Sequence, residues 1–348
     1  MVQVSTDACA RRPSLPDGWT RPCRAALGLV AAALLAAGCA DGGGRPDQDR
    51  PAAVATTQAV TPPAQPAAGP GGSLRRHARA RSTRLGGAAS GVTIFEPAQP
   101  TPARAPLVVF TQGVEPDAYQ GWIDHLVGRG SIVVFQNLPY RGIGLRERRA
   151  GSVAGLRAAL RELRRSGHVR PQPGAVVLVG HSIGAVMAAQ LAADLAAGGM
   201  PRPAALFALQ PPTEDEGGLR PLRRIPPSTL LLVLASDRDD RVGEEGARRL
   251  WAALGHVRPA NRNYVRVRSD QRGSVTLLAD HLFPLSSASN PPDALDYLGA
   301  WKLLDGLQRC ATVRRDCGFA LGGSARQRFM GRWSDGSPVA PMEVTMQP

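Results

Sequence analysis

From about residue 91 onward, short unbroken runs of apolar residues alternate with longer segments in which apolar residues recur every three or four positions. Each unbroken run predicts a strand buried on both faces; the runs are 92–95, 107–111, 132–136, 175–180, 205–209, 230–235 and 264–267. Helical spacing is found in the segments 119–127, 153–163 and 183–197. Such strands, alternating with helices, form mostly parallel sheets. The pattern therefore predicts an α/β fold in which helices cover both faces of the central sheet.

The first 39 residues have the pattern of an export signal. A positively charged beginning is followed by the uncharged, apolar stretch 25–37, which ends at Gly38-Cys39. This ending is similar to the bacterial lipobox, in which the cysteine is lipidated and becomes the new N-terminus. Ala36 stands where leucine is usual, so cleavage without lipidation stays open. We expect an exported protein, either a cell-envelope lipoprotein anchored in the membrane through Cys39 or a secreted protein.

Residues 40–90 are rich in proline, alanine, glycine and arginine and contain almost no large apolar side chain. Such a segment cannot bury enough apolar surface to offset the entropy that is lost on ordering. We therefore predict a disordered linker between the signal and a single folded domain that spans residues 91–348.

The charge of the chain is strongly positive, with a formal net charge of +14 over 348 residues. Lys302 is the only lysine, so nearly all of the positive charge comes from arginines, which are dispersed along the chain. Neither a nucleic-acid-binding motif nor interleaved aromatic residues accompany them. We do not expect nucleic acid as a partner.

The sequence most specific for a chemical role lies in residues 175–197, where an apolar strand runs through Gly180-His181-Ser182-Ile183-Gly184 into an alanine-rich helix. A tight turn from strand to helix needs very small residues at positions 180 and 184. It lifts the hydroxyl of Ser182 into the crevice at the carboxyl ends of the strands. The segment predicts Ser182 as a nucleophile.

A nucleophilic serine needs a base, and the base needs an acid; in this architecture they follow the serine in the order acid, then histidine. Three aspartates follow the run 230–235, at positions 237, 239 and 240. The segment resembles α/β-hydrolases in which the strand ends in G-x-x-D-x-x-V, although Ser236 replaces the glycine. Asp239 is in register with Val242 in this pattern and is our candidate, with Asp237 and Asp240 as alternatives.

Two histidines follow these aspartates. His256 lies at the expected end of a helix before the strand 264–267, where we expect it to cap the helix. His281 comes after that strand, where this fold presents its base on a loop. We therefore predict His281 as the catalytic base.

The oxyanion hole of such a site consists of two backbone N–H groups. One belongs to Ile183, directly after the nucleophile. The other lies on the loop after the strand 107–111, where Gln112 stands in place of the usual histidine and leaves Gly113 and Val114 as candidates, of which we choose Val114. Tyr119, a few residues further on, is a candidate for an aromatic wall of the substrate site.

Cys310 and Cys317 are the two cysteines outside the leader, and in an exported protein they predict one local disulfide. No second pair of cysteines or histidines lies near them, so we expect neither a metal nor another cofactor.

The resemblance extends from about residue 91 to residue 341. The segments Tyr119-Gln-Gly-Trp-Ile-Asp-His-Leu-Val and Asp280-His-Leu-Phe-Pro-Leu-Ser look like those of exported bacterial α/β-hydrolases of the dienelactone hydrolase and polyester-hydrolase group. The resemblance implies the α/β-hydrolase fold and a Ser-Asp-His triad, and says little about the substrate.

These observations predict a monomeric serine esterase that acts on small-molecule or polymeric esters. The connection 211–228 is too short and too rich in proline and arginine for a large cap domain, which favours short acyl groups and accessible esters. Two alternatives remain open: an acyltransferase that uses the same triad, and a catalytically silent envelope-binding protein that keeps the fold.

Overall fold

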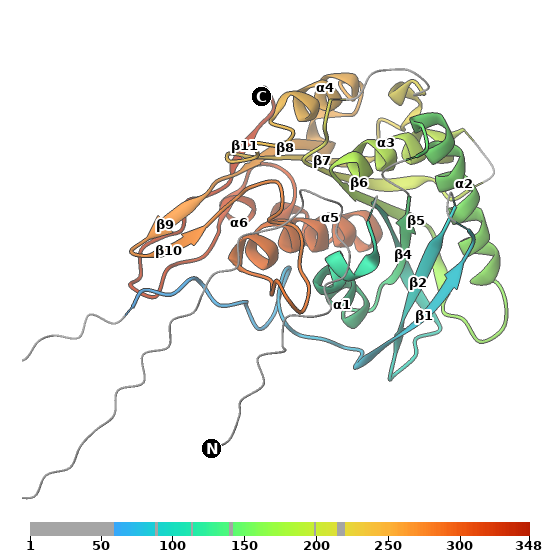
Figure 1. Cartoon of the computed structure of the whole chain (residues 1–348), viewed down its shortest axis with the longest axis horizontal. Coiled ribbons are helices and arrows are strands. Elements are labelled where there is room, and N and C mark those ends of the chain that lie inside the picture. Colours follow the sequence, from blue (N-terminus) through green and yellow to red (C-terminus); the bar gives the residue numbers. More distant parts are fainter. Residues whose placement is uncertain (1–58, 88–89, 113, 139–141, 198–199, 214–219) are drawn as a thin grey trace, which may run out of the picture.

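The computed structural model describes residues 59–87, 90–112, 114–138, 142–197, 200–213 and 220–348. Its centre is a nine-stranded sheet with the strand order β1-β2-β4-β3-β5-β6-β7-β8-β11 (Figure 1). The six strands from β4 to β8 in this order are parallel to one another, whereas β1, β2 and β11 join antiparallel at the two ends. The predicted mostly parallel sheet is therefore confirmed.

Each of the seven predicted strands is present. The strands of the large sheet are β1 (Arg79–Leu85), β2 (Val92–Ala98), β3 (Arg104–Gln112), β4 (Ile132–Asn137), β5 (Arg170–His181), β6 (Pro203–Leu209), β7 (Leu230–Ser236), β8 (Arg262–Val267) and β11 (Glu343–Thr345). A separate hairpin consists of β9 (Asp270–Arg272) and β10 (Val275–Leu277).

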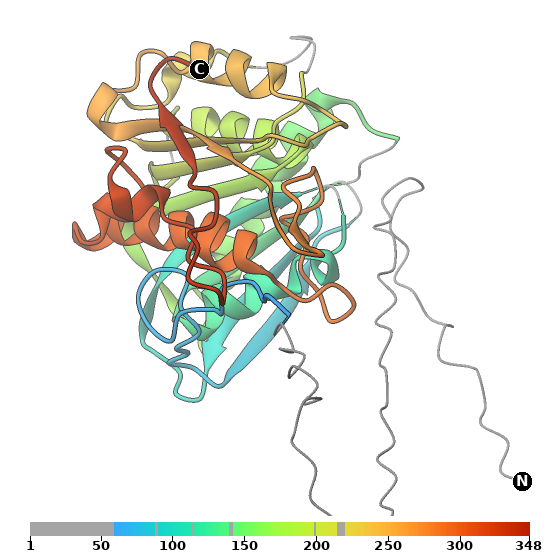
Figure 2. The same cartoon turned by 90° about the vertical axis from the view of Figure 1, so that its left-hand side faces the viewer.

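Helices cover both faces of the sheet. The α-helices are α1 (Gln120–Gly128), α2 (Leu145–Glu162), α3 (Ile183–Ala196), α4 (Glu245–Ala253), α5 (Trp301–Val313) and α6 (Ala325–Arg328). Short 3-10 helices are η1 (Pro116–Tyr119), η2 (Leu222–Arg224), η3 (Pro259–Asn261) and η5 (Cys317–Phe319), and the π-helical segment η4 (Leu295–Ala300) leads into α5. Helices α2, α3 and α4 pack on one face, and α1 and α5 on the other, as Figures 1 and 2 show.

The alternation of side chains along the central strands explains these two layers. Leu107 and Val109 of β3 belong to the core under α2, α3 and α4, whereas Val108 and Phe110 belong to the core under α1 and α5. Successive side chains of a strand point to opposite faces, so a strand must be apolar throughout when both faces are covered. The unbroken apolar runs in the sequence have this cause.

The prediction of a disordered linker over residues 40–90 is wrong for its second half. Residues 59–78, which we call the N-terminal strap, lie against the side of the domain that carries α1 and α5, drawn in blue in Figure 1. The hydroxyl of Tyr297 donates to the carbonyl of Pro63, and the N–H of Gly71 donates to the carboxylate of Asp305 at 2.8 Å. These partners lie more than 200 positions away in the sequence. Local composition therefore gave no sign that the segment is ordered.

The arginine-rich stretch that follows the strap is an edge strand. All seven residues of β1 pair with β2, from Arg79 opposite Ala98 to Leu85 opposite Val92. Arg81 also forms an ion pair of 2.9 Å with the buried Glu96. Charged side chains on an edge strand hinder pairing with a second chain. The domain therefore begins well before residue 91.

The C-terminal segment packs on the face of α5, as Figure 2 shows in red. The predicted disulfide between Cys310 and Cys317 is present and joins the end of α5 to η5. Lys302 in α5 is 3% exposed, and its ammonium group donates to the carbonyl of Phe329 in this segment. Burial lowers the pKa of Lys302 to about 7.

Among the described residues, no helix is both long enough and apolar enough to cross a membrane. The predicted export signal, Cys39 and residues 40–58 lie outside the described residues. Residues 210–213 and 220–229, the described part of the connection between β6 and β7, contain one short helical turn, η2.

Candidate active site

Ser182 lies between β5 and α3. Its backbone, with φ 56° and ψ −133°, has a conformation that residues other than glycine rarely adopt. The turn is held by hydrogen bonds from Ser182 N to Leu209 O (2.9 Å) and from Ala185 N to Ser182 O (2.8 Å). The structure thus places the serine on a sharp turn at the carboxyl end of a central strand, as the sequence predicts.

The two glycines of the motif allow this turn to form. A Cβ atom on Gly180 would lie 2.1 Å from the carbonyl oxygen of Gly184, and one on Gly184 would lie 2.0 Å from that of Thr111. Both contacts are with backbone, which cannot move aside. Any larger residue at either position would therefore displace Ser182.

The three predicted triad residues lie in hydrogen-bonding contact although they are far apart in the sequence. His281 Nε2 is 3.0 Å from Ser182 Oγ, and His281 Nδ1 is 2.8 Å from Asp239 Oδ2. An ionised carboxylate only accepts hydrogen bonds, so Nδ1 carries the proton and Nε2 can accept the proton of the serine. All three are largely buried, with exposed fractions of 4% for Ser182, 8% for Asp239 and 1% for His281.

The structure selects Asp239 among the three candidate acids. Its second carboxylate oxygen accepts from the N–H groups of Arg241 and Val242, at 3.1 Å each. These bonds orient the carboxylate toward His281. Asp237 instead binds the backbone N–H and hydroxyl of Ser269, and Asp240 is exposed.

His256 is separate from this group. Its Nε2 lies 2.8 Å from the carbonyl of Ile225, beyond the end of α4. His256 therefore follows α4 as predicted, but the capping role is wrong: its hydrogen bond goes to the residue after η2 and not to the last turn of α4.

The predicted oxyanion hole is described only in part. Ile183 is the first residue of α3, where an N–H group has no partner within its own helix. Val114 is buried on the loop after β3, and that strand contacts the serine turn through Thr111 and Gln112. Gly113, the alternative to Val114, lies outside the described residues.

Tyr119 is not the substrate-facing wall that we predicted. Its exposed fraction is 0%, and its ring packs against Phe110 and Phe135 at centroid distances of 5.0 and 6.0 Å. Its hydroxyl lies 2.5 Å from His181 Nδ1. Tyr119 is the last residue of η1, directly before α1, and its ring packs inward against β3 and β4, so it is buried rather than exposed to a substrate.

A polar cluster behind the nucleophile was missed in the sequence. Gln112 Nε2 donates to the Tyr119 hydroxyl at 2.5 Å and to the backbone carbonyl of His181 at 3.0 Å. Gln210, whose side chain also interacts with His181, donates from Nε2 to Ser236 Oγ (2.7 Å) and to the carbonyl of Asp280 (2.8 Å). Gln112 was a visible departure from the usual histidine, but its partners could not be read from the chain.

Two pKa values in this cluster depart from their usual range. The pKa of His181 lies well below its usual value, because the ring is fully buried and because it is close to His281. Burial raises the pKa of Tyr119, against the smaller opposing effect of the hydrogen bond from Gln112. Both side chains are therefore neutral at neutral pH.

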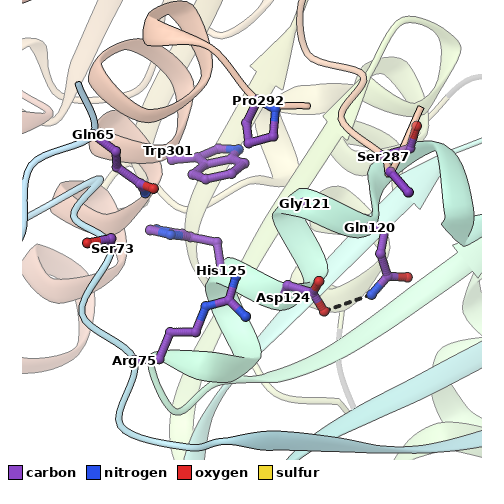
Figure 3. Close-up of a pocket in the computed structure, with 11 residues that line it drawn as sticks. Gln65, Ser73, Arg75, Gln120, Gly121, Asp124, His125, Ser287, Pro292 and Trp301 are labelled. Carbon is purple, nitrogen blue, oxygen red and sulfur yellow. Dashed lines mark hydrogen bonds between the residues drawn. The ribbon is translucent and has the colours of Figure 1, made fainter. Parts of the chain in front are cut away.

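A cavity of about 300 Å³ lies where the N-terminal strap meets α1, α5 and the loop that follows His281 (Figure 3). Arg75 of the strap, Asp124 of α1 and Trp301 of α5 contribute to its lining, and Asp124 accepts a hydrogen bond from Gln120 at 2.8 Å. Ser182, Asp239 and His281 do not line this cavity. It is therefore distinct from the triad.

Within the described ranges, no group of three or more histidine, cysteine, aspartate or glutamate residues is arranged to hold a metal ion. The chain matches no model of a known protein family, and no curated protein matches its sequence.

Proposed function

We propose that the chain is a serine hydrolase of the α/β-hydrolase fold that cleaves carboxylic esters. The observation that carries the proposal is the hydrogen-bonded series of Ser182 Oγ, His281 Nε2, His281 Nδ1 and Asp239 Oδ2, with distances of 3.0 and 2.8 Å. The strained turn of Ser182 at the end of a central parallel strand supports it. The sequence resemblance to exported bacterial hydrolases of the dienelactone hydrolase and polyester-hydrolase group is consistent with it.

In the first half of the reaction, Ser182 Oγ attacks the carbonyl carbon of the ester while its proton passes to His281 Nε2. Asp239 stabilises the resulting imidazolium. When the tetrahedral intermediate collapses, the bond to the alcohol breaks and His281 returns its proton to the leaving oxygen. In the second half, water repeats the sequence on the acyl-enzyme and releases the acid.

The negative charge on the carbonyl oxygen requires donors that are already in place. The N–H of Ile183 at the start of α3 is one, and the positive end of the helix dipole adds to it. We assign the second to the loop after β3, at Val114 or its neighbour Gly113.

We propose short acyl groups and accessible esters as substrates. The described residues between β6 and β7 contain only one short turn, η2, which is too small to form an apolar wall for a long acyl chain. Rates on p-nitrophenyl acetate should exceed those on p-nitrophenyl palmitate, with no increase above the micelle threshold. A long-chain optimum with interfacial activation would contradict this substrate class.

Export through residues 1–39, with lipidation of Cys39 as the form of anchoring, remains part of the proposal. It would place the enzyme in the cell envelope. Mass spectrometry of the mature N-terminus would distinguish a lipidated Cys39 from plain cleavage.

The test of the activity is labelling with a fluorophosphonate probe together with hydrolysis of p-nitrophenyl acetate. Ser182→Ala should abolish labelling and lower hydrolysis by about 10³-fold or more, with little change in thermal stability. Ser289→Ala, an exposed serine on the loop after His281, is the matched control and should behave as the wild type. Hydrolysis retained by Ser182→Ala would overturn the mechanism, and labelling without hydrolysis would replace hydrolysis by acyl transfer.

A further inference from the structure

The ring of His181 lies directly behind the triad. Its centroid is 4.8 Å from that of His281, with an angle of 40° between the rings, and the side chain is completely buried. When His281 takes the proton of Ser182 it becomes a cation, and a second cation at this distance in a buried site would oppose that step. The protonation state of His181 therefore bears on the reaction.

The contacts around His181 favour one arrangement of protons. Besides Tyr119, the side chain of Gln210 and the backbone of His281 interact with the ring. Gln112 Nε2 can only donate, so the Tyr119 hydroxyl accepts from Gln112 and keeps its own proton for a second hydrogen bond. His181 Nδ1, 2.5 Å from the hydroxyl, is the acceptor that we assign to this proton. A hydrogen bond accepted at Nδ1 opposes protonation there, so it adds to burial and to the nearby His281 in keeping His181 neutral, with its hydrogen on Nε2. The titratable groups close to His181 are Tyr119 from η1 and His281 from the loop after β10, with Asp239 on the far side of His281.

We propose that Tyr119 and Gln112 are positioning residues that act through His181. They keep the ring beside the catalytic base uncharged and in a single tautomer, so that His281 alone carries the positive charge during turnover. This proposal rests on the proposed function and assigns a role to the glutamine that replaces the usual histidine after β3.

The same glutamine also fixes the serine turn. Gln112 Nε2 donates to the backbone carbonyl of His181, the residue before the nucleophile, at 3.0 Å. The carbonyl of Gln112 in turn accepts from the N–H of Leu138 after β4. The loop that we assign to the oxyanion hole and the turn of Ser182 are therefore joined through one side chain.

The test is a double-mutant cycle of Tyr119→Phe and His181→Asn, measured on p-nitrophenyl acetate as a function of pH. The phenylalanine keeps the packing against Phe110 and Phe135 but cannot donate to His181. Asparagine can accept the tyrosine hydrogen bond and cannot be protonated. Tyr119→Phe should lower kcat about 10-fold with little change in KM, and shift the acid limb of the kcat profile to higher pH.

In the His181→Asn background, Tyr119→Phe should change neither kcat nor the acid limb further, because the group through which it acts has been replaced. Independent, multiplicative losses in the double variant, or an acid limb that does not move in Tyr119→Phe, would overturn the proposal. If Tyr119→Phe does not fold, as judged by thermal unfolding, Gln112→Met replaces it in the same cycle and should shift the acid limb in the same direction.

The behaviour of the wild type distinguishes failure of this proposal from failure of the proposed esterase activity. A wild type that neither reacts with the fluorophosphonate nor hydrolyses the ester would overturn the proposed function. An active wild type together with a Tyr119→Phe variant of unchanged profile would overturn only the role of Tyr119.

Discussion

The described part of the chain contains two buried histidine–aspartate pairs of similar length, one formed through Nδ1 of its histidine and the other through Nε2. His281 and Asp239 are 2.8 Å apart, and His125 in α1 and Asp305 in α5 are 3.0 Å apart. The first pair has a serine hydroxyl on the remaining ring nitrogen of its histidine. In the second pair, the ring of His125 stacks on Trp301 at 4.6 Å, and the same carboxylate oxygen also binds Arg129 and the N–H of Gly71.

The difference shows that distance and burial alone do not define a catalytic pair. Asp239 receives backbone N–H groups and directs its charge to one ring, which favours transfer of a proton through that ring. The charge of Asp305 is shared among α1, α5 and the N-terminal strap, so it holds three segments together. We therefore expect changes to the first pair to affect rate and changes to the second to affect stability.

The largest effect should come from the histidines. His281→Ala should lower kcat/KM by about 10³-fold or more and leave the unfolding temperature nearly unchanged, because it removes the base and little packing. His125→Asn should do the reverse, with lower stability and a rate close to that of the wild type at a temperature where it is folded. Rates on p-nitrophenyl acetate and thermal unfolding curves of both variants make the comparison.

His256→Ala serves as a third arm, since its ring contacts only the carbonyl of Ile225 among the described hydrogen bonds. Its activity should remain close to that of the wild type. Loss of activity in His256→Ala or in His125→Asn, with His281→Ala active, would mean that the wrong pair has been assigned to catalysis.

The aspartate of the first pair gives the next largest effect. Asp239→Asn should lower kcat by about 10²–10³-fold, somewhat less than loss of the base, because the amide favours the wrong tautomer of His281. Asp237→Asn is the matched control two residues away, and its carboxylate binds Ser269 instead. Equal losses of kcat in the two variants would show that the loop after β7 has another register.

Asp305→Asn should be the most destabilising change in the second pair, at roughly 3–5 kcal/mol of unfolding free energy, because it leaves Arg129 and His125 without their shared partner. Burial alone would raise the pKa of Asp305, but the interactions with His125, Arg129 and Gly71 outweigh burial and lower it. The stabilisation is thus complete above the ordinary aspartate pKa of 3.8 and is lost as the pH falls below it.

The contribution of the Asp305 charge to stability can be measured by denaturant unfolding of the wild type and of Asp305→Asn at several pH values. The difference in unfolding free energy between the two should be largest near neutral pH and should shrink below about pH 4. A difference that stays constant down to pH 2 would show that the charge of Asp305 is not what stabilises the contact.

The smallest effect concerns the end of α5, the helix that carries Asp305. Cys317→Ser opens the loop closed by the disulfide with Cys310, and on the chain-entropy model should cost roughly 2–3 kcal/mol of unfolding free energy. Esterase activity should not change, since the disulfide does not touch the triad. A larger loss of activity than of stability would connect α5 to the catalytic pair and weaken the contrast between the two.

The sequence contained enough information for the centre of the fold and for the triad. Strand β5, the turn at Ser182 and helix α3 follow one another in the chain, and a local pattern of apolar, small and alanine-rich residues is sufficient to predict them. Asp239 and His281 followed from the order of residues along such a sheet, although 42 and 99 positions separate the residues in contact.

The parts that could not be predicted depend on contacts between distant segments. The N-terminal strap lacks large apolar residues and is held by partners such as Tyr297 and Asp305, which nothing in its own composition indicates. The hydroxyl of Tyr119 could have faced a substrate or a buried histidine, and only the packing of α1 against β3 and β4 decides between them.

The single lysine of the chain has a consequence for chemical labelling. The side chain of Lys302 extends from α5 and is covered by the segment around Phe329. Its lowered pKa leaves much of the amine near pH 7 in the unprotonated form, which is the nucleophilic one. Lys302 is therefore the one side-chain amine that an amine-directed reagent can acylate. Its burial, and not its protonation, limits the reaction. The rate of acylation at Lys302, read by mass spectrometry, would report how often the C-terminal segment opens while the rest of the molecule stays folded.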